Sequence, residues 1–413
     1  MPHTKNLAQI DLNLIRVGEP LPFVLRSASG VLLANKGYVI GSRDELEALV
    51  AKGVDFYVNA DDLRTYRAKL DQLMRSSSAS LGDIAALTIQ DSGPKTTPDQ
   101  RARDRDDEWD AQNTPINWIA VQARASQLLR SPSSGNFIEL RFAALHEVLV
   151  RGCRESPDAT LLALIFLSSQ ETRMYSATHA MLVSCVCMLT ADGALGWPHE
   201  RVLQVGRAAL SMNIAMTELQ DRLAHQIQPL ASSQVAAVES HAARSEDLLR
   251  ELGVTDPLWL EAVRCHHHRN PGALSEKTEA QQMARLIQRA DIFAARLAPR
   301  IARSPMPVTA AMHASYYDET KQVDQAGAAI VKALGIYPPG SFVRLASQEI
   351  AIVLRRGASA TTPRVAVVIN RDGLPTGGLI PRDSANPAWK ITGVATPKEV
   401  RVQLSLERLL ALV

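Results

Sequence analysis

The sequence predicts a mainly α-helical protein with a small β-rich part on either side of the helices. Helical periodicity fills the middle of the chain, short β-branched runs broken by glycine occupy residues 7 to 60, and three more β-rich runs follow Gly335. At 413 residues with 46% hydrophobic and 21% charged side chains, the chain is long enough for two or three domains with a sizeable core.

Residues 1–74 are expected to form a small β-rich module that ends in a helix. Strands are predicted at Phe23–Arg26, Val31–Leu33 and Asp55–Val58, where β-branched or alternating apolar residues lie between turn residues. The segment Ser42–Gly53 combines a cap serine, a glutamate three residues later and a terminal glycine, which indicates a compact helix. Asp62–Met74 is predicted to be a charged amphipathic helix.

Residues 75–113 are predicted to be a flexible linker. The stretch is rich in Ser, Gly, Pro, Thr, Asp and Arg and includes the charge-dense run Arg101–Glu108. Such a composition buries too little apolar surface to offset the entropy lost on ordering. A solvated helix is the alternative for its second half.

Residues 114–376 are expected to form a helical domain with an appended sheet. Thr114 is the predicted cap and Pro115 the first turn of its first helix. Helices are predicted at 115–130, 136–151, 157–171, 176–192, 198–216, 231–252, 256–268, 278–298 and 319–334, and strands at 342–345, 350–354 and 365–369. Residues 377–413 are Gly/Pro-rich and are expected to be a C-terminal extension with a short amphipathic end at 398–412.

Charge and cysteines exclude some classes of function. A net charge of +2 without a concentrated basic patch argues against nucleic-acid binding. Cys153, Cys185, Cys187 and Cys265 form no CxxC pair, which favours reduced core thiols in a cytoplasmic protein. The longest apolar run, Leu161–Leu167, is far short of a membrane span, and no export signal is expected.

Three adjacent histidines, His266 to His268, end the predicted helix that Pro271 and Gly272 stop. Histidines at a helix C-terminus can bond the free carbonyls there and interact with the negative end of the dipole. Adjacent histidines can also be two ligands of a metal site whose other ligands come from distant helices. On this stretch alone the first interpretation is favoured.

An ordered set of motifs elsewhere in the chain favours the metal-ligand interpretation of these histidines. Tyr175-Ser-Ala-Thr-His179 begins one helix, His241 lies in a second, and His266-His267 is followed by Ala290-Asp291. In this order and spacing, residues 170 to 370 resemble an HD-GYP domain, the bacterial relative of the HD phosphohydrolases that hydrolyses cyclic di-GMP. Arg300 and Arg303 fall where that family has R-x-Y-R, and Gly335–Leu345 is similar to its G-x-Y-P-x-G-S-x-V-x-L. Residues 7 to 60 resemble the module that often precedes it.

Three positions depart from the family pattern. Met212 and Asn213 stand where the resemblance implies the namesake His-Asp, and Met216 stands where it implies lysine. The implied aspartate bridges two metal ions, and a neutral asparagine lacks the charge for that role. A thioether is a poor ligand for hydrolytic metals, and Met216 removes a cation that would face the phosphate. The second signature also departs, with His268 for the glutamate and no G-Y-P.

The resemblance implies that His241, His266 and His267 surround one metal, while His179 and Asp291 are left of the other site. A three-histidine site of this kind suits zinc, so we expect either no cofactor or one divalent metal, zinc, iron or manganese. The alternatives are a hydrogen-bonded core residue for His179 and a surface position for His241. Asp291 would then pair with Arg285 or Arg289.

The preferred hypothesis is therefore a catalytically inactive, HD-GYP-like bacterial signalling protein that acts through protein contacts or ligand sensing. Expected partners are signalling proteins such as a diguanylate cyclase, cyclic di-GMP itself, or a second copy in a homodimer. The first alternative is a metal-dependent phosphohydrolase or cyclic di-GMP phosphodiesterase that uses the residual histidines. The second is a purely structural interaction module.

Overall fold

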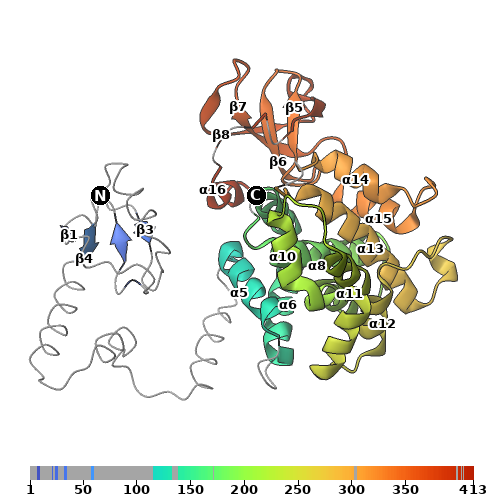
Figure 1. The fold of residues 1–413 in the computed structure, drawn as a ribbon. Coiled ribbons are helices and arrows are strands. Elements are labelled where there is room, and N and C mark those ends of the chain that lie inside the picture. The colour runs from blue at the N-terminus through green and yellow to red at the C-terminus, as the bar shows by residue number, and fades with distance from the viewer. Residues whose placement is uncertain are drawn as a thin grey trace, which may run out of the picture. The chain divides into compact units, whose positions relative to one another are not determined.

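The computed structural model describes residues 7–9, 21, 24–26, 32–34, 57–59, 115–132, 138–170, 172–301, 305–396, 399–400, 402 and 404–413. The chain divides into two compact units, Met1–Asn113 and Thr114–Val413 (Figure 1).

The described part of the first unit is an antiparallel sheet of four short strands in the order β1-β4-β2-β3. Its strands are β1 (Leu7–Gln9), β2 (Leu25–Arg26), β3 (Leu32–Ala34) and β4 (Tyr57–Asn59). The last three overlap the predicted strands, and the buried Leu25 and Val58 give them an apolar face. The helices expected at 42–53 and 62–74 and the linker at 75–113 lie outside the described residues.

The second unit is a helical bundle followed by a sheet, as the sequence predicts. Its longer helices are α5 (Trp118–Arg130), α6 (Ile138–Glu155), α7 (Pro157–Gln170), α8 (Tyr175–Gly193), α9 (His199–Ser211), α10 (Thr217–His225), α11 (Ser232–Glu251), α12 (Pro257–Cys265), α13 (Glu279–Leu297), α14 (Val308–Tyr316) and α15 (Gln325–Leu334). A 3-10 turn, η3 (Ile214–Met216), lies between α9 and α10. None of the described helices is both long and apolar enough to cross a membrane.

Two predicted helix starts are wrong because another residue caps the helix. Asn117, not Thr114, precedes α5, and its side chain accepts a hydrogen bond from the Ala120 N–H at 3.1 Å. The helix expected from 319 begins only at Gln325, because Asp324 caps it by accepting from the Gly327 N–H at 2.9 Å. The chain before it turns on Asp318, which accepts from the backbone of Gln322. Helices α10 and α14 were not predicted as separate elements.

Helix α8 is the centre of the bundle and contacts α5, α6, α7, α9, α10, α13 and α15. It is buried all round, which its run of small and apolar residues allows. Helix α9 approaches it closely at Gly206, whose carbonyl accepts from the Ser184 hydroxyl at 2.8 Å. A Cβ at Gly206 would meet the Met188 sulfur and the His146 ring at 2.6 Å, so a glycine is needed there.

The C-terminal sheet is antiparallel in the order β8-β7-β6-β5-β9 and lies at one end of the bundle (Figure 1). Its strands are β5 (Phe342–Leu345), β6 (Ile350–Arg355), β7 (Arg364–Ile369), β8 (Pro375–Asp383) and β9 (Ile391–Val394), followed by the short helix α16 (Leu406–Leu410). The sheet therefore continues past residue 376, where the sequence suggested that an extension begins. The prolines and glycines of β8 are why its sequence did not predict a strand. Proline is tolerated in edge strands, and β8 is an edge strand of this sheet.

Candidate metal centre

Three histidines from two separated segments converge at one point of the bundle. His241 comes from α11, where it shares the buried face with Ser245 and Leu249 at helical spacing. His266 is the C-cap of α12, and His267 follows it. The Nε2 atoms of His241 and His266 are 3.2 Å apart, as are those of His241 and His267. The structure thus brings together the three residues that the sequence assigned to one metal, and His241, expected as an alternative at the surface, is buried.

The ring orientations leave nitrogen lone pairs facing each other. His241 donates through Nδ1 to the Val238 carbonyl at 2.5 Å, and His266 donates through Nδ1 to the Val263 carbonyl at 2.6 Å. Because a carbonyl can only accept, each Nδ1 carries the proton and each neutral ring turns an unprotonated Nε2 toward the other. The 3.2 Å contact between these atoms is therefore not a hydrogen bond between neutral rings, and a shared cation is needed to satisfy it.

A proton is a poor candidate for that cation. Burial, followed by the charge of His267, lowers the pKa of His266 to about 3. Burial also lowers the pKa of His241. A divalent metal fits better, since tetrahedral zinc with Zn–N bonds of about 2.0–2.1 Å holds its ligand nitrogens roughly 3.3–3.4 Å apart. The three histidines present therefore fit one metal ion.

The position of His266 is compatible with both interpretations of the histidine run. Its Nδ1–H satisfies a carbonyl in the last turn of α12, as the helix-end interpretation requires. Its Nε2 faces the cluster, as the metal interpretation requires. His268 is exposed and takes no part in the cluster.

The second pair of predicted ligands is already engaged. His179, on α8, contacts an oxygen of Asp291, on α13, through Nε2 at 2.7 Å. Burial alone would raise the pKa of Asp291, but the hydrogen bond and charge of His179, with smaller effects of His267 and His266, hold that pKa at about 2. Asp291 is therefore an ionised carboxylate beside the histidine cluster, and the core-residue interpretation of His179 describes this contact well.

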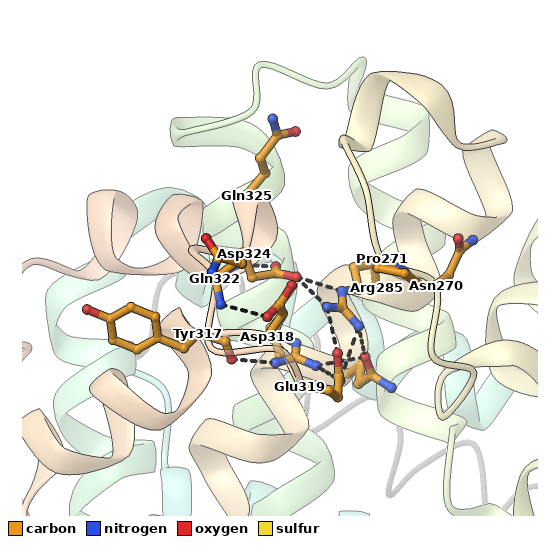
Figure 2. Close-up of polar contacts among 12 residues, drawn as sticks. Asn270, Pro271, Arg285, Tyr317, Asp318, Glu319, Gln322, Asp324 and Gln325 are labelled. Carbon is orange, nitrogen blue, oxygen red and sulfur yellow. Dashed lines mark hydrogen bonds and ion pairs between the residues drawn. The ribbon is translucent and has the colours of Figure 1, made fainter.

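The alternative partners of Asp291, Arg285 and Arg289, are bound elsewhere. Figure 2 shows Arg285 directed at Glu319 and Asp324, to which it donates at 3.1 and 2.7 Å. Arg289 donates to the Tyr317 carbonyl at 2.9 Å and also to Glu319. Residues two apart on a helix do not share a face, so Arg289 cannot reach Asp291. This network ties α13 to the turn before α15 and leaves Asp291 to His179.

The three departures from the family pattern lie in different surroundings. Met212 is fully buried and is absent from the described lining of the neighbouring cavity. Asn213 and Met216 do line that cavity. The Asn213 Oδ1 atom is buried and has no hydrogen-bond partner among the described residues, which leaves a neutral oxygen directed to no protein donor.

The cavity beside the cluster has a volume of about 540 Å³. Its polar side includes His179, His241, His267, Asp291 and Arg300. Arg300 donates to the Tyr175 hydroxyl at 2.9 Å, which leaves a guanidinium in the wall where an anionic group can be balanced. The helices that carry the histidines are held by Glu246, which accepts from Arg250 on α11 and from Arg264 on α12, both at 2.7 Å.

Several residues that line the cavity were not predicted from the sequence. They are Gln220 and Leu223 of α10 and the loop from Gln226 to Leu230. Because α10 was not predicted, no pattern placed these residues beside His241. Arg303, the second arginine of the family motif, lies outside the described residues.

Two comparisons give similar proteins. The chain is 26% identical over 253 residues to the cyclic di-GMP phosphodiesterase PA4108 of Pseudomonas aeruginosa, and the match spans 60% of each chain. A solved structure of Bd1817, an HD-GYP protein from Bdellovibrio bacteriovorus, is 13% identical and aligns with 79% of this chain and 99% of its own at a TM-score of 0.42. No protein-family model matches the chain. The resemblance that the ordered motifs predicted is confirmed by the similarity to this cyclic di-GMP phosphodiesterase, of whose length the match spans less than two thirds.

Proposed function

We propose that the Thr114–Val413 unit holds one divalent metal in the three-histidine cluster and binds a phosphate ester of the cyclic di-GMP class beside it, without hydrolysing it at a useful rate. The observation that carries this proposal is the convergence of three histidine Nε2 atoms at the edge of a cavity of about 540 Å³, where the unprotonated Nε2 atoms of His241 and His266 face each other at 3.2 Å. A bound divalent ion would polarise a phosphate oxygen and lower the pKa of a bound water.

Slow or absent hydrolysis is inferred from the other half of the site. Asn213 supplies no bridging charge, and Met216 supplies no cation toward the phosphate. His179 and Asp291 bond to each other, so neither stands ready for a second ion. The polar residues left in the wall, notably Arg300, can bind and orient a phosphate, which is what ligand sensing requires.

Metal-dependent phosphodiesterase activity is the second candidate. The Pseudomonas relative supports it more directly than it supports an inactive protein. The ionised Asp291 beside the cluster also favours it, because a carboxylate there can orient an attacking water. In this case the chain would use one metal where its relatives' chemistry is expected to use two.

Binding and turnover separate the two candidates. The full chain, loaded with manganese or zinc, is titrated with cyclic di-GMP by calorimetry and then incubated with it while the linear dinucleotide and GMP are quantified. His267→Gln removes an accessible ligand of the cluster, and His268→Gln is the matched control at the next position. Metal-dependent binding that His267→Gln alone abolishes, with no product formed, is the expected result.

Other outcomes decide against the first candidate. Metal-dependent product that is lost only in His267→Gln would replace it with the phosphodiesterase. Failure of the metal-loaded protein to bind cyclic di-GMP or GMP would overturn both.

The signal from a bound ligand is proposed to pass to a signalling protein such as a diguanylate cyclase. An HD-GYP-like scaffold with little turnover can still present a surface that changes on ligand binding. Affinity purification from the native host with and without cyclic di-GMP should enrich a partner in only one of the two states. Identical partner sets in both states would contradict this part of the proposal.

A further inference from the structure

The cavity extends well beyond the histidine cluster. Helix α11 begins at Ser232, nine residues before His241, and at a rise of ~1.5 Å per residue its start lies roughly 14 Å along the axis from that histidine. Ile227 and Leu230, in the loop before α11, line the same cavity as His241. A phosphate group alone cannot span this length, so a ligand that fills the cavity carries a second, larger part.

Gln220 of α10 also lines this cavity. Only 6% of the residue is exposed, and its amide makes no hydrogen bond with any described residue. Its neighbour Asp221 accepts from the Ser176 N–H and from Arg130 and so holds α10 against α8 and α5. A glutamine amide offers a donor and an acceptor side by side, which matches the paired donor and acceptor on the edge of a nucleobase.

The apolar loop beside Gln220 is held in place by its own hydrogen bonds. The amides of Gln226 and Gln234 bond each other reciprocally at 3.1 and 2.8 Å, and Gln234 also accepts from the Ala231 N–H at 2.9 Å. Ile227 and Leu230 are nevertheless 68% and 48% exposed. Two large apolar side chains held exposed at a cavity rim provide a surface for a flat ring.

We infer that Gln220, Ile227 and Leu230 form a nucleobase subsite, in which the amide bonds the edge of the base and the two aliphatic side chains cover its face. This inference rests on the proposed function, because the phosphate of the same ligand lies at the histidine cluster. It adds that α10 and the following loop select the base of that ligand.

The test compares two ligands that differ only in the base. GMP and ribose 5-phosphate are titrated into the zinc-loaded full chain, with cyclic di-GMP as a third probe. We expect wild type to bind GMP at least about tenfold more tightly than ribose 5-phosphate, the size of one or two hydrogen bonds. Gln220→Met keeps the side-chain length and Ile227→Ser removes the apolar cover. Each should weaken GMP binding about tenfold and leave ribose 5-phosphate binding and zinc content unchanged.

Leu374→Ser, at a site of similar exposure in the turn between β7 and β8, is the matched control and should change nothing. Equal affinities of wild type for GMP and ribose 5-phosphate would overturn the subsite and leave the proposed function standing. Equal losses of both ligands in Gln220→Met would overturn it too, because the residue would then act through the fold. No binding of any of the three probes by wild type would overturn the proposed function and the subsite together.

Discussion

The two halves of the histidine-rich site differ in how their polar atoms are satisfied. In the half formed by His241, His266 and His267, the unprotonated Nε2 atoms of His241 and His266 face each other at 3.2 Å. In the half formed by His179 and Asp291, a histidine and a carboxylate satisfy each other at 2.7 Å. The first arrangement is unfavourable unless a cation is bound, and the second is stable without one. We therefore expect a metal in the first half and none in the second.

The largest expected effect is that zinc stabilises the protein through one half of the site and not through the other. A ligand present at 1,000 times its Kd stabilises the folded state by about 4 kcal/mol. We expect a rise in unfolding free energy of this order for wild type and for His179→Gln, and none for His267→Gln, measured by thermal unfolding with zinc and with chelator. Loss of the zinc effect in His179→Gln as well would show that the two halves act as one site.

Acid should weaken the metal-free protein before it affects the Asp291 pair. The folded-state pKa of His266 is about 3, and that of the buried His146 is also about 3 because of burial and then Arg207. Below about pH 6.5 the unfolded chain binds protons that these folded residues exclude, so stability present above pH 6.5 is lost as pH falls toward 3. Each such group contributes about 1.4 kcal/mol per pH unit in that window.

Chemical denaturation in chelator between pH 7 and 4 measures this slope. His146→Leu should make the slope shallower, because an apolar side chain of similar size replaces one of the two groups. Asp291 contributes only between its usual pKa and about 2, where its stabilisation is lost as the carboxylate is protonated. A slope unchanged by His146→Leu would mean that this ring is not a source of the acid sensitivity.

Removing the carboxylate from the satisfied half should cost stability but not metal. Asp291→Ala leaves the buried Nε2 of His179 without an acceptor, which is expected to lower the free energy of unfolding by about 1–3 kcal/mol. Asp291→Asn keeps an acceptor and should lose less. Urea denaturation in chelator gives both values, and an Asp291→Asn variant weaker than Asp291→Ala would contradict the pairing.

The smallest expected effect is on metal binding in the half that contains His179 and Asp291, when a negative charge is introduced beside it. Asn213→Asp places an anion at a buried position where Oδ1 has no partner among the described residues. Met212 stays in the core, so only a weak second metal is expected, detectable by elemental analysis at high manganese but lost on dialysis. Two equivalents retained after dialysis would show that the missing charge alone had emptied that half.

Local sequence signals predicted most of the elements in the helical unit and much of the sheet, because periodicity and β-branched runs report burial directly. These signals were wrong or silent where a helix N-cap set the start of a helix, or where a strand lies at the edge of the sheet. Helices α5 and α15 begin later than the sequence predicts, because Asn117 and Asp324 are their N-caps. The edge strand β8 contains prolines and glycines that a central strand would exclude.

The sequence by itself determined which residues are candidate ligands and which positions depart from the HD-GYP pattern that it resembles, since residue identity and order suffice for both. Only the tertiary structure decided how they are used. It turned the Nδ1 atoms of His241 and His266 to carbonyls, and so left their Nε2 atoms facing each other. It paired Asp291 with His179 of α8 rather than with an arginine of α13. It also placed Gln220 in the lining of the cavity beside the histidines. Side-chain partners come from segments distant in sequence, and their geometry depends on how whole helices cross, which no local pattern records.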